Sequence, residues 1–180
     1  FDSVEIVPLG TDESLMRVPD GADDWLICKR ATPDRANACA PDAATTPGRP
    51  TTTPTQVPPT ATPLPGTEGG DLVVNEVQTD NAATVRDEAG EYDDWVELYN
   101  RGDAAIGLGD YFLSDEAQDP WKFALPAVDL APGARLLVWC DGTAEQGALH
   151  ASFKLSKEGE TVYLSTRAAT ISGRQRGMLS

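Results

Sequence analysis

The fold class follows first from one stretch, Asp94-Trp95-Val96-Glu97-Leu98-Tyr99-Asn100. Val96 and Leu98 point to one face of this stretch, whereas Trp95, Glu97 and Tyr99 point to the other. Alternation with a period of two residues is the pattern of a β-strand that buries one face. A turn sequence containing glycine follows directly, so the pattern predicts a strand that ends near residue 100.

Similar short runs lie on both sides of this strand and are separated by turn residues. They occupy residues 72–77, 105–108, 111–113, 121–125, 136–140, 153–155 and 161–164. No window keeps a helical apolar stripe over three turns. Roughly seven to nine short strands with this spacing predict an all-β, two-sheet antiparallel β-sandwich. The expected core residues are Val74, Val96, Leu98, Phe112, Phe123, Leu137, Trp139, Val162 and Leu164.

Composition narrows the function classes. The chain has 180 residues, with 14 Lys and Arg against 29 Asp and Glu, and a net charge of −15. That balance opposes nucleic-acid binding, which depends on clustered basic side chains. No run of about 18 apolar residues occurs, so no membrane span is expected. The chain begins at Phe1 without a leader, and we expect it to be a piece of a longer protein.

The middle of the chain has a different composition. Residues 41–70 contain eight of the fourteen prolines, nine threonines and only three charged residues. Such a segment cannot bury enough apolar surface to offset the entropy of ordering it. We therefore predict a Thr/Pro-rich linker over residues 41–70, extended and with few contacts between 43 and 68.

Several pieces after the linker resemble, in order, the lamin-tail domain. The pieces are residues 74–77 (VNEV), 94–100 (DWVELYN), 108–115 (LGDYFLSD), 121–123 (WKF), 130–133 (LAPG) and 153–164 (FKLSKEGETVYL). The resemblance covers about residues 71–172 and is to the bacterial secreted branch of the family. It implies an immunoglobulin-like fold. The motif residues with an implied structural role are Asn75, Glu76, Asp94, Trp95, Glu97, Tyr99 and Asn100.

The first 40 residues resemble the closing section of the same domain type. The matching positions are Asp2 to Ile6, Ser14, Arg17, Asp20-Gly21, Trp25, Thr32-Pro33 and Asn37. We therefore expect residues 1–40 to be the C-terminal remnant of an upstream copy, and residues 71–180 a second copy truncated at its C-terminus. An alternative is an N-terminal appendage unique to this chain.

The repeat interpretation carries a structural expectation. Strands Ser3 to Ile6 and Asp24 to Cys28 would fill the vacant edges of the second copy, because open edges and uncovered apolar side chains are unfavourable. Residues Thr170 to Ser180 would compete for the first of these positions.

Acidic and polar residues offer candidate sites. Asp87, Glu91, Asp93 and Asp94, with Glu88, could hold Ca²⁺ through carboxylate oxygens. They lack the spacing of a calcium loop, and a solvated acidic loop is the favoured interpretation. Asn75, Glu76 and Glu97 could form a buried polar network or a ligand site, although such strand residues usually face outward or bond to turn backbone.

Histidine, tryptophan and cysteine residues each allow a functional and a structural interpretation. His150 with Ser152 could suggest a hydrolase, but no nucleophile-elbow motif is present, so His150 is expected at the surface. Trp121 and Trp139 could stack on a sugar ring, but a role in the core is favoured. Cys28 and Cys39 could form a disulfide that closes a short loop. Cys140, at the end of an apolar run, is expected to be buried.

The sequence predicts a non-catalytic interaction or anchoring module of a larger secreted or surface protein. No nucleophile–base pair or metal-ligand cluster supports an enzyme, and no cofactor or metal is expected. The expected partners are a protein or cell-surface component and neighbouring domains of the same chain, with no nucleic acid. The expected location is extracellular or on a bacterial cell surface. The alternative is a Ca²⁺-dependent adhesion or carbohydrate-binding sandwich.

Overall fold

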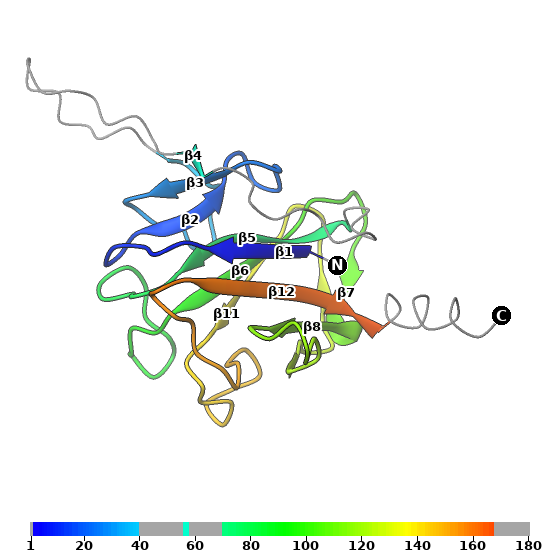
Figure 1. The fold of residues 1–180 in the computed structure, drawn as a ribbon. Helices are drawn as coiled ribbons and strands as arrows, with labels where there is room; N and C mark the ends of the chain where they lie inside the picture. The colour runs from blue at the N-terminus through cyan, green and yellow to red at the C-terminus, as the bar shows by residue number, and fades with distance from the viewer. Residues whose placement is uncertain (1, 40–55, 58–69, 168–180) are drawn as a thin grey trace, which may run out of the picture.

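A computed structural model describes residues 2–39, 56–57 and 70–167. These residues form a β-sandwich built from short strands, with one 3₁₀ turn, η1 (Leu108–Asp110) (Figure 1). The strands are β1 (Asp2–Ile6), β2 (Ser14–Arg17), β3 (Trp25–Cys28), β4 (Gln56–Val57), β5 (Leu72–Gln78), β6 (Trp95–Asn100), β7 (Ile106–Gly107), β8 (Tyr111–Ser114), β9 (Phe123–Ala124), β10 (Asp129–Leu130), β11 (Arg135–Trp139) and β12 (Glu160–Thr166).

Two large sheets form the layers of the sandwich. One has six strands in the order β11-β6-β5-β2-β3-β4, the other has four in the order β1-β12-β8-β9, and β10 pairs with β7 in a small ladder. Every strand pairing between these elements is antiparallel. The described residues contain no α-helix of three turns. The predicted all-β, immunoglobulin-like sandwich is therefore confirmed.

The main core lies between the two sheets. Seven of the nine expected core residues are buried: Val74, Val96, Leu98, Phe112, Trp139, Val162 and Leu164. The other two, Phe123 and Leu137, are half-buried. Leu137 packs against Trp95 and Trp139 in a second, smaller cluster, whereas Val138 belongs to the main core. We expected Leu137 and Trp139 of β11 to point into the main core, but Val138 does so instead. Trp139 is nevertheless buried, because the second cluster covers the opposite face of the strand.

A β-bulge interrupts the alternation of β5. Val74 pairs with Leu98 and Glu76 pairs with Glu97, so Asn75 is the extra residue. The extra residue shifts the side-chain alternation by one position. Val74 and Val77, three residues apart, therefore both reach the main core.

The N-terminal segment completes both sheets. β1 pairs with β12 along its whole length, and β2 pairs with β5 (Figure 1). The expectation that Ser3 to Ile6 would dock is met, with Val4 and Ile6 in the main core. The expectation that the Asp24 to Cys28 strand would fill the other open edge was wrong. Strand β2 pairs with β5 at that edge, and β3, which contains Trp25 to Cys28, pairs with β2. All four residues of β2 are buried, so it forms an inner strand, and the more exposed β3 lies outside it.

Part of the predicted linker has regular structure. Gln56 and Val57 form β4, which pairs with Leu26 and Trp25 of β3. The expectation of no strand pairing in this segment is wrong at these two residues. The remainder of the tract lies outside the described residues.

Candidate functional site

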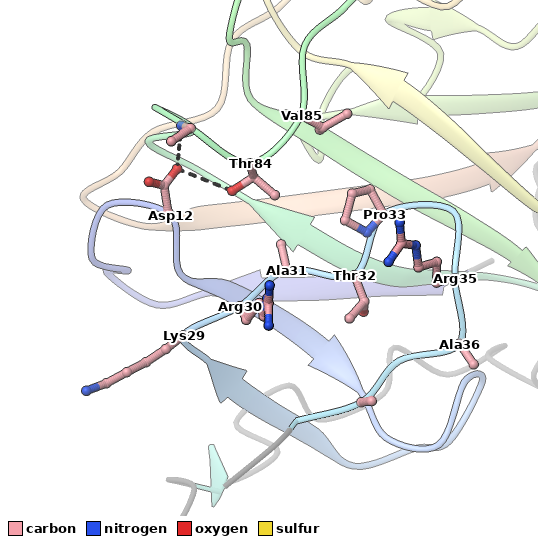
Figure 2. A pocket seen from close by; sticks show the side chains of 12 residues that line it. Asp12, Lys29, Arg30, Ala31, Thr32, Pro33, Arg35, Ala36, Thr84 and Val85 are labelled. Atoms are coloured by element: carbon pink, nitrogen blue, oxygen red, sulfur yellow. Dashed lines mark hydrogen bonds between the residues drawn. The ribbon is translucent and has the colours of Figure 1, made fainter. Parts of the chain in front are cut away.

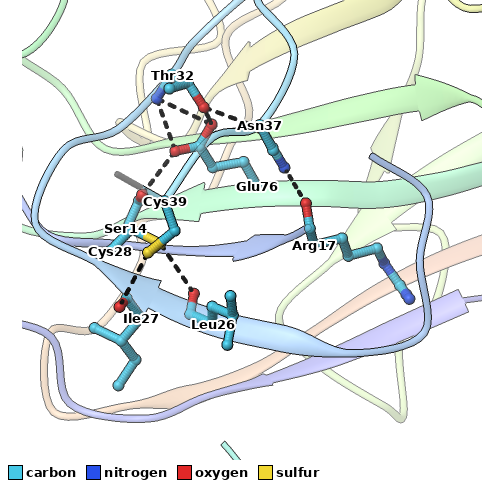
Figure 3. Close-up of a disulfide and its surroundings, with 9 residues drawn as sticks. All are labelled: Ser14, Arg17, Leu26, Ile27, Cys28, Thr32, Asn37, Cys39 and Glu76. Atoms are coloured by element: carbon cyan, nitrogen blue, oxygen red, sulfur yellow. Dashed lines mark hydrogen bonds between the residues drawn. A yellow bond between two sulfur atoms is a disulfide. The ribbon is translucent and has the colours of Figure 1, made fainter. Parts of the chain in front are cut away.

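Asn75, Glu76 and Glu97 form the polar core, a buried cluster on the face of β5 and β6 opposite the main hydrophobic core. All three are fully buried and do not face outward. Each instead accepts a hydrogen bond from loop backbone, which is the second of the two arrangements expected for such strand residues. Glu76 accepts hydrogen bonds from Ser14 Oγ at 2.6 Å, Thr32 N at 3.0 Å and Thr32 Oγ1 at 3.0 Å (Figure 3). The segment after β3 therefore covers this face of the sheet and supplies donors to its carboxylate.

Glu97 and Asn75 are held in the same way. Asp34 N donates to Glu97 Oε2 at 2.7 Å, and Asn75 Nδ2 donates to Glu97 Oε1 at 3.0 Å. Gly21 N donates to Asn75 Oδ1 at 2.9 Å. Each functional group of these side chains thus has a partner within the chain. Of the two alternatives posed by the sequence, the structure shows a buried polar network.

Burial changes the acidity of both carboxyl groups. Removal from water raises the pKa of Glu97 to about 7, although hydrogen bonds from Asn75 and Asp34 oppose the shift. Burial also raises the pKa of Glu76, against the opposing hydrogen bonds from Ser14 and Thr32. A carboxylate in low dielectric disfavours its charged form, which explains both directions.

Charged side chains fix the surrounding turns to the polar core. Arg17 Nε donates to Val74 O at 2.7 Å, and its Nη2 makes a two-oxygen contact with Asp2 at 3.0 and 3.1 Å. Arg135 donates to Asp20 and lies 3.7 Å from Glu97 Oε1. These ion pairs connect the N-terminal segment to strands far away in the sequence. They were not predicted, because single charged residues in turns carry no pattern that identifies their partners.

A disulfide closes the segment that covers the polar core. Cys28 and Cys39 are bonded, with their Cα atoms 5.4 Å apart (Figure 3). The closed loop contains Thr32, Asp34 and Asn37, all of which hydrogen-bond to β5 or β6 residues. The cross-link thus restricts the residues that supply donors to Glu76 and Glu97.

The same loop borders a surface hollow of about 830 Å³ (Figure 2). Its lining comes from residues 29–38 and 83–85, together with Asp12. The basic side chains Arg30 and Arg35 line it, in a chain of net charge −15. The carboxylate of Asp12 already has partners within the chain, since its Oδ1 accepts hydrogen bonds from Ala82 N and Ala83 N. These bonds lower the pKa of Asp12. The lining of the hollow therefore contains more basic than acidic side chains.

The other motif residues also make structural contacts. Asn100 Nδ2 donates to Ala104 O at 2.8 Å and Leu130 O at 2.9 Å. Trp95 Nε1 donates to Gln78 Oε1 at 2.8 Å. The Tyr99 ring lies beneath the Arg135 guanidinium, 4.9 Å from ring centroid to Cζ.

The acidic loop gathers only part of its candidate set. Ligand oxygens of Asp87, Glu91 and Asp93 lie within 4.8 Å of one another. Asp94 is outside this group, and its Oδ1 accepts a hydrogen bond from Asn81 N at 3.1 Å. Burial, followed by the nearby Asp141 and Asp87 carboxylates, raises the pKa of Asp93.

His150 is fully buried, so its predicted surface position is wrong. Its Nδ1 lies 2.7 Å from Asp141 Oδ2, and its Nε2 lies 3.2 Å from Glu88 Oε1. Burial alone would lower the pKa of His150, but the Asp141 and Glu88 carboxylates more than offset this and raise it. The burial could not be predicted, because Asp141 and Glu88 come from different loops and no local pattern shows that these loops meet at His150.

The remaining aromatic and thiol candidates divide between core and surface. Trp139 is buried, whereas Trp121 is 42% exposed, which contradicts its predicted place in the core. Cys140 is a buried free cysteine, as expected. Burial raises the pKa of its thiol, and nearby carboxylates add to the shift.

A comparison with protein families places this geometry in context. The family model of the lamin tail domain matches residues 65–176. The chain belongs to the lamin tail domain family. Lamin tail domains are immunoglobulin-like, non-catalytic modules that interact with proteins. No curated protein and no solved structure matches the chain.

Strands β1, β2 and β3 precede the part of the chain that matches the lamin tail domain. Glu76 and Glu97 therefore accept hydrogen bonds from residues that lie outside the matched part, namely Ser14, Thr32 and Asp34. Among the described residues, no helix is long and apolar enough to cross a membrane.

Proposed function

We propose that this lamin tail domain is a non-catalytic interaction or anchoring module outside the cell, within a larger multidomain bacterial protein. The observation that carries the proposal is the Cys28–Cys39 disulfide, because structural disulfides persist in oxidising compartments and are rare in the cytosol. The Thr/Pro-rich composition of residues 41–70 supports a spacer between modules.

The hollow next to the disulfide-closed loop is the proposed contact surface. Arg30 and Arg35 line it, and the rest of the chain is strongly acidic. Complementary charge steers and orients association more than it sets affinity. An exposed acidic group on a protein or cell-surface partner fits this surface, and the net charge opposes a nucleic acid.

Localisation and binding are tested separately. An antibody against the chain should label intact cells or the culture medium of the producing organism, with Cys28 and Cys39 blocked from thiol reagents. The purified chain should bind saturably to isolated cell envelopes, and the Arg30→Glu/Arg35→Glu variant should bind more weakly. The matched control is Arg86→Glu, which changes an exposed arginine outside the hollow. A protein found only in the cytoplasm with both cysteines reduced, or no saturable binding, contradicts the proposal.

A carbohydrate-binding sandwich is the second candidate, and the exposure of Trp121 favours it. An exposed indole offers an apolar face on which a sugar ring can stack. Titration with cell-wall oligosaccharides should then shift tryptophan fluorescence, and Trp121→Ala should abolish the shift. Unchanged fluorescence across a panel of such sugars would exclude this candidate.

A further inference from the structure

One ring nitrogen of His150 is hydrogen-bonded to Asp141, and the other faces Glu88. Its Nδ1 lies 2.7 Å from Asp141 Oδ2, and Asp141 Oδ1 accepts a hydrogen bond from Thr143 N at 2.8 Å. An ionised carboxylate only accepts hydrogen bonds, so Nδ1 carries the proton. In the neutral imidazole Nε2 then holds a lone pair. This buried Nε2 has no hydrogen-bond partner among the described residues.

The carboxylates of Asp87 and Glu88 lie close to the His150 ring. Ligand atoms of Asp87, Glu88 and His150 all lie within 4.8 Å of one another, with Glu88 Oε1 3.2 Å from Nε2. Asp87 is buried and fixed, because its Oδ1 accepts a hydrogen bond from Glu91 N at 2.7 Å. Its second oxygen, Oδ2, is buried without a partner in the described part of the chain. Two buried side chains of this group thus each have one ligand atom without a hydrogen-bond partner.

A glycine lines this place. A Cβ atom built on Gly147 would lie 3.2 Å from Glu88 Oε1 and 3.3 Å from the His150 ring. A larger residue there would crowd both candidate ligands. Glu91 and Asp93 form a second group with Asp87 and add to the negative charge. The cluster therefore combines excess negative charge, unsatisfied ligand atoms and a close approach of backbone.

We propose that Asp87, Glu88 and His150 bind one divalent transition-metal ion, with Zn²⁺ as the ion to test first. Zn²⁺ accepts imidazole nitrogen together with carboxylate oxygen and commonly has four ligands, so water or a neighbouring carboxylate completes the site. Ca²⁺ prefers six to eight oxygen ligands, which an imidazole does not provide. Asp141 is a positioning residue, because a carboxylate on the far nitrogen orients a metal-binding histidine.

The ion would connect two loops that are distant in the sequence. Asp87 and Glu88 lie between β5 and β6, whereas His150 lies between β11 and β12. Binding that occurs only in the folded state raises the melting temperature. The role is structural and independent of the proposed function, so either proposal can fail alone.

The test uses the full chain without a histidine tag, because His150 is the only histidine in the sequence. Chelator-treated protein is titrated with ZnCl₂ alone by calorimetry, and the imidazole ¹⁵N signals are followed by NMR. We expect one saturable site, a large shift of the Nε2 signal with Nδ1 still protonated, and a higher melting temperature. Both ring signals belong to His150, so the assignment is unambiguous.

Two variants separate ligand loss from loss of fold. Glu88→Gln removes a carboxylate whose side chain is 63% exposed, and Asp87→Asn keeps the oxygen that accepts from Glu91 N. Each should weaken Zn²⁺ binding at least about tenfold with an unchanged far-ultraviolet spectrum. The control is Glu145→Gln, which makes the same charge change at an exposed position on the 141–150 loop. It should bind like the unmodified chain.

Several results would overturn the proposal. They are no saturable heat with ZnCl₂, an unmoved Nε2 signal at saturation, and equal loss of affinity in Glu145→Gln. CaCl₂ alone binding as tightly as ZnCl₂ would also overturn it, because that points to the oxygen-only group of Asp87, Glu91 and Asp93.

Discussion

At the scale of single residues, the buried carboxyl of Glu97 makes the stability of the fold depend on pH. Its pKa is about 7 in the folded chain, because it is buried, against an ordinary value of 4.5. The folded state therefore binds more protons than the unfolded state between these two values. The free energy of unfolding falls as pH rises through this window, by up to about 3 kcal/mol from Glu97 alone.

Glu97→Gln should remove this contribution. The variant loses one acceptor for Asp34 N or Asn75 Nδ2, so it is less stable at pH 5. Its stability should nevertheless decline less between pH 5 and pH 7 than that of the unmodified chain. Urea unfolding at several pH values measures the difference. Glu5→Gln, at an exposed strand position, is the control and should keep the original slope.

Arg17 shows why a substitution that keeps the charge is not enough at a buried position. Its guanidinium donates to Val74 O, Asp2 and Ala22 O at once and lies over the Trp25 ring. A lysine retains the charge but cannot reproduce a planar, multi-donor fork. Arg17→Lys should therefore lower the free energy of unfolding by about 2 kcal/mol. Arg86→Lys, at an exposed arginine, should change it by less than about 0.5 kcal/mol in the same denaturant series.

At the scale of elements, the disulfide-closed loop controls the cover of the polar core. Cys28→Ser/Cys39→Ser should lower the free energy of unfolding by about 3 kcal/mol, as chain-entropy arguments give for short loops. Amide exchange should accelerate most at Thr32 and Asp34, whose N–H groups bond to Glu76 and Glu97. A reducing agent should reproduce the loss in the unmodified chain and have no further effect on the variant. Unchanged exchange at both amides would contradict this role.

The elements also show which parts of the fold can be predicted from the sequence. The strand at Trp95–Asn100 was predictable because its alternating pattern and its turn are local. Both of its faces are nevertheless buried, since residues 29–39 cover the second face. The covering residues are more than 50 positions away in the sequence, so the local alternation of side chains cannot predict them. For the same reason β2, buried at all four positions, was not predicted as a strand.

The residues of the candidate sites also divide into those that a local pattern predicts and those that only the fold brings together. The sequence identified Asn75, Glu76 and Glu97 by their unusual place in a strand, and it identified the cysteine pair by spacing. It did not identify Asp87, Glu88 and His150 as one group, because their proximity depends on how two loops meet. Side-chain type suggests chemistry, but only the fold brings the atoms together.

At the scale of the whole molecule, the sandwich depends on residues that precede the part matching the lamin tail domain. Without β1, strand β12 loses one of its two antiparallel partners and keeps only β8. Without β2, strand β5 likewise keeps only β6. Val4, Ile6 and Leu15 would no longer cover the core, and Glu76 would lose Ser14 and Thr32. Each orphaned buried polar group costs about 1–3 kcal/mol, and a whole domain is stable by only about 5–15 kcal/mol.

A fragment of residues 45–180 should therefore fail to fold, although it contains the entire match to the family. We expect no cooperative melting transition and strong binding of a hydrophobic dye, because the apolar edges stay open. A peptide of residues 1–44, oxidised between Cys28 and Cys39, should restore the transition when added in trans. The control is the full chain cleaved at a protease site inserted between Ala44 and Thr45, which should remain one folded complex. A fragment that melts cooperatively alone, at a temperature close to that of the full chain, would show that β1–β3 are an accessory to a complete sandwich.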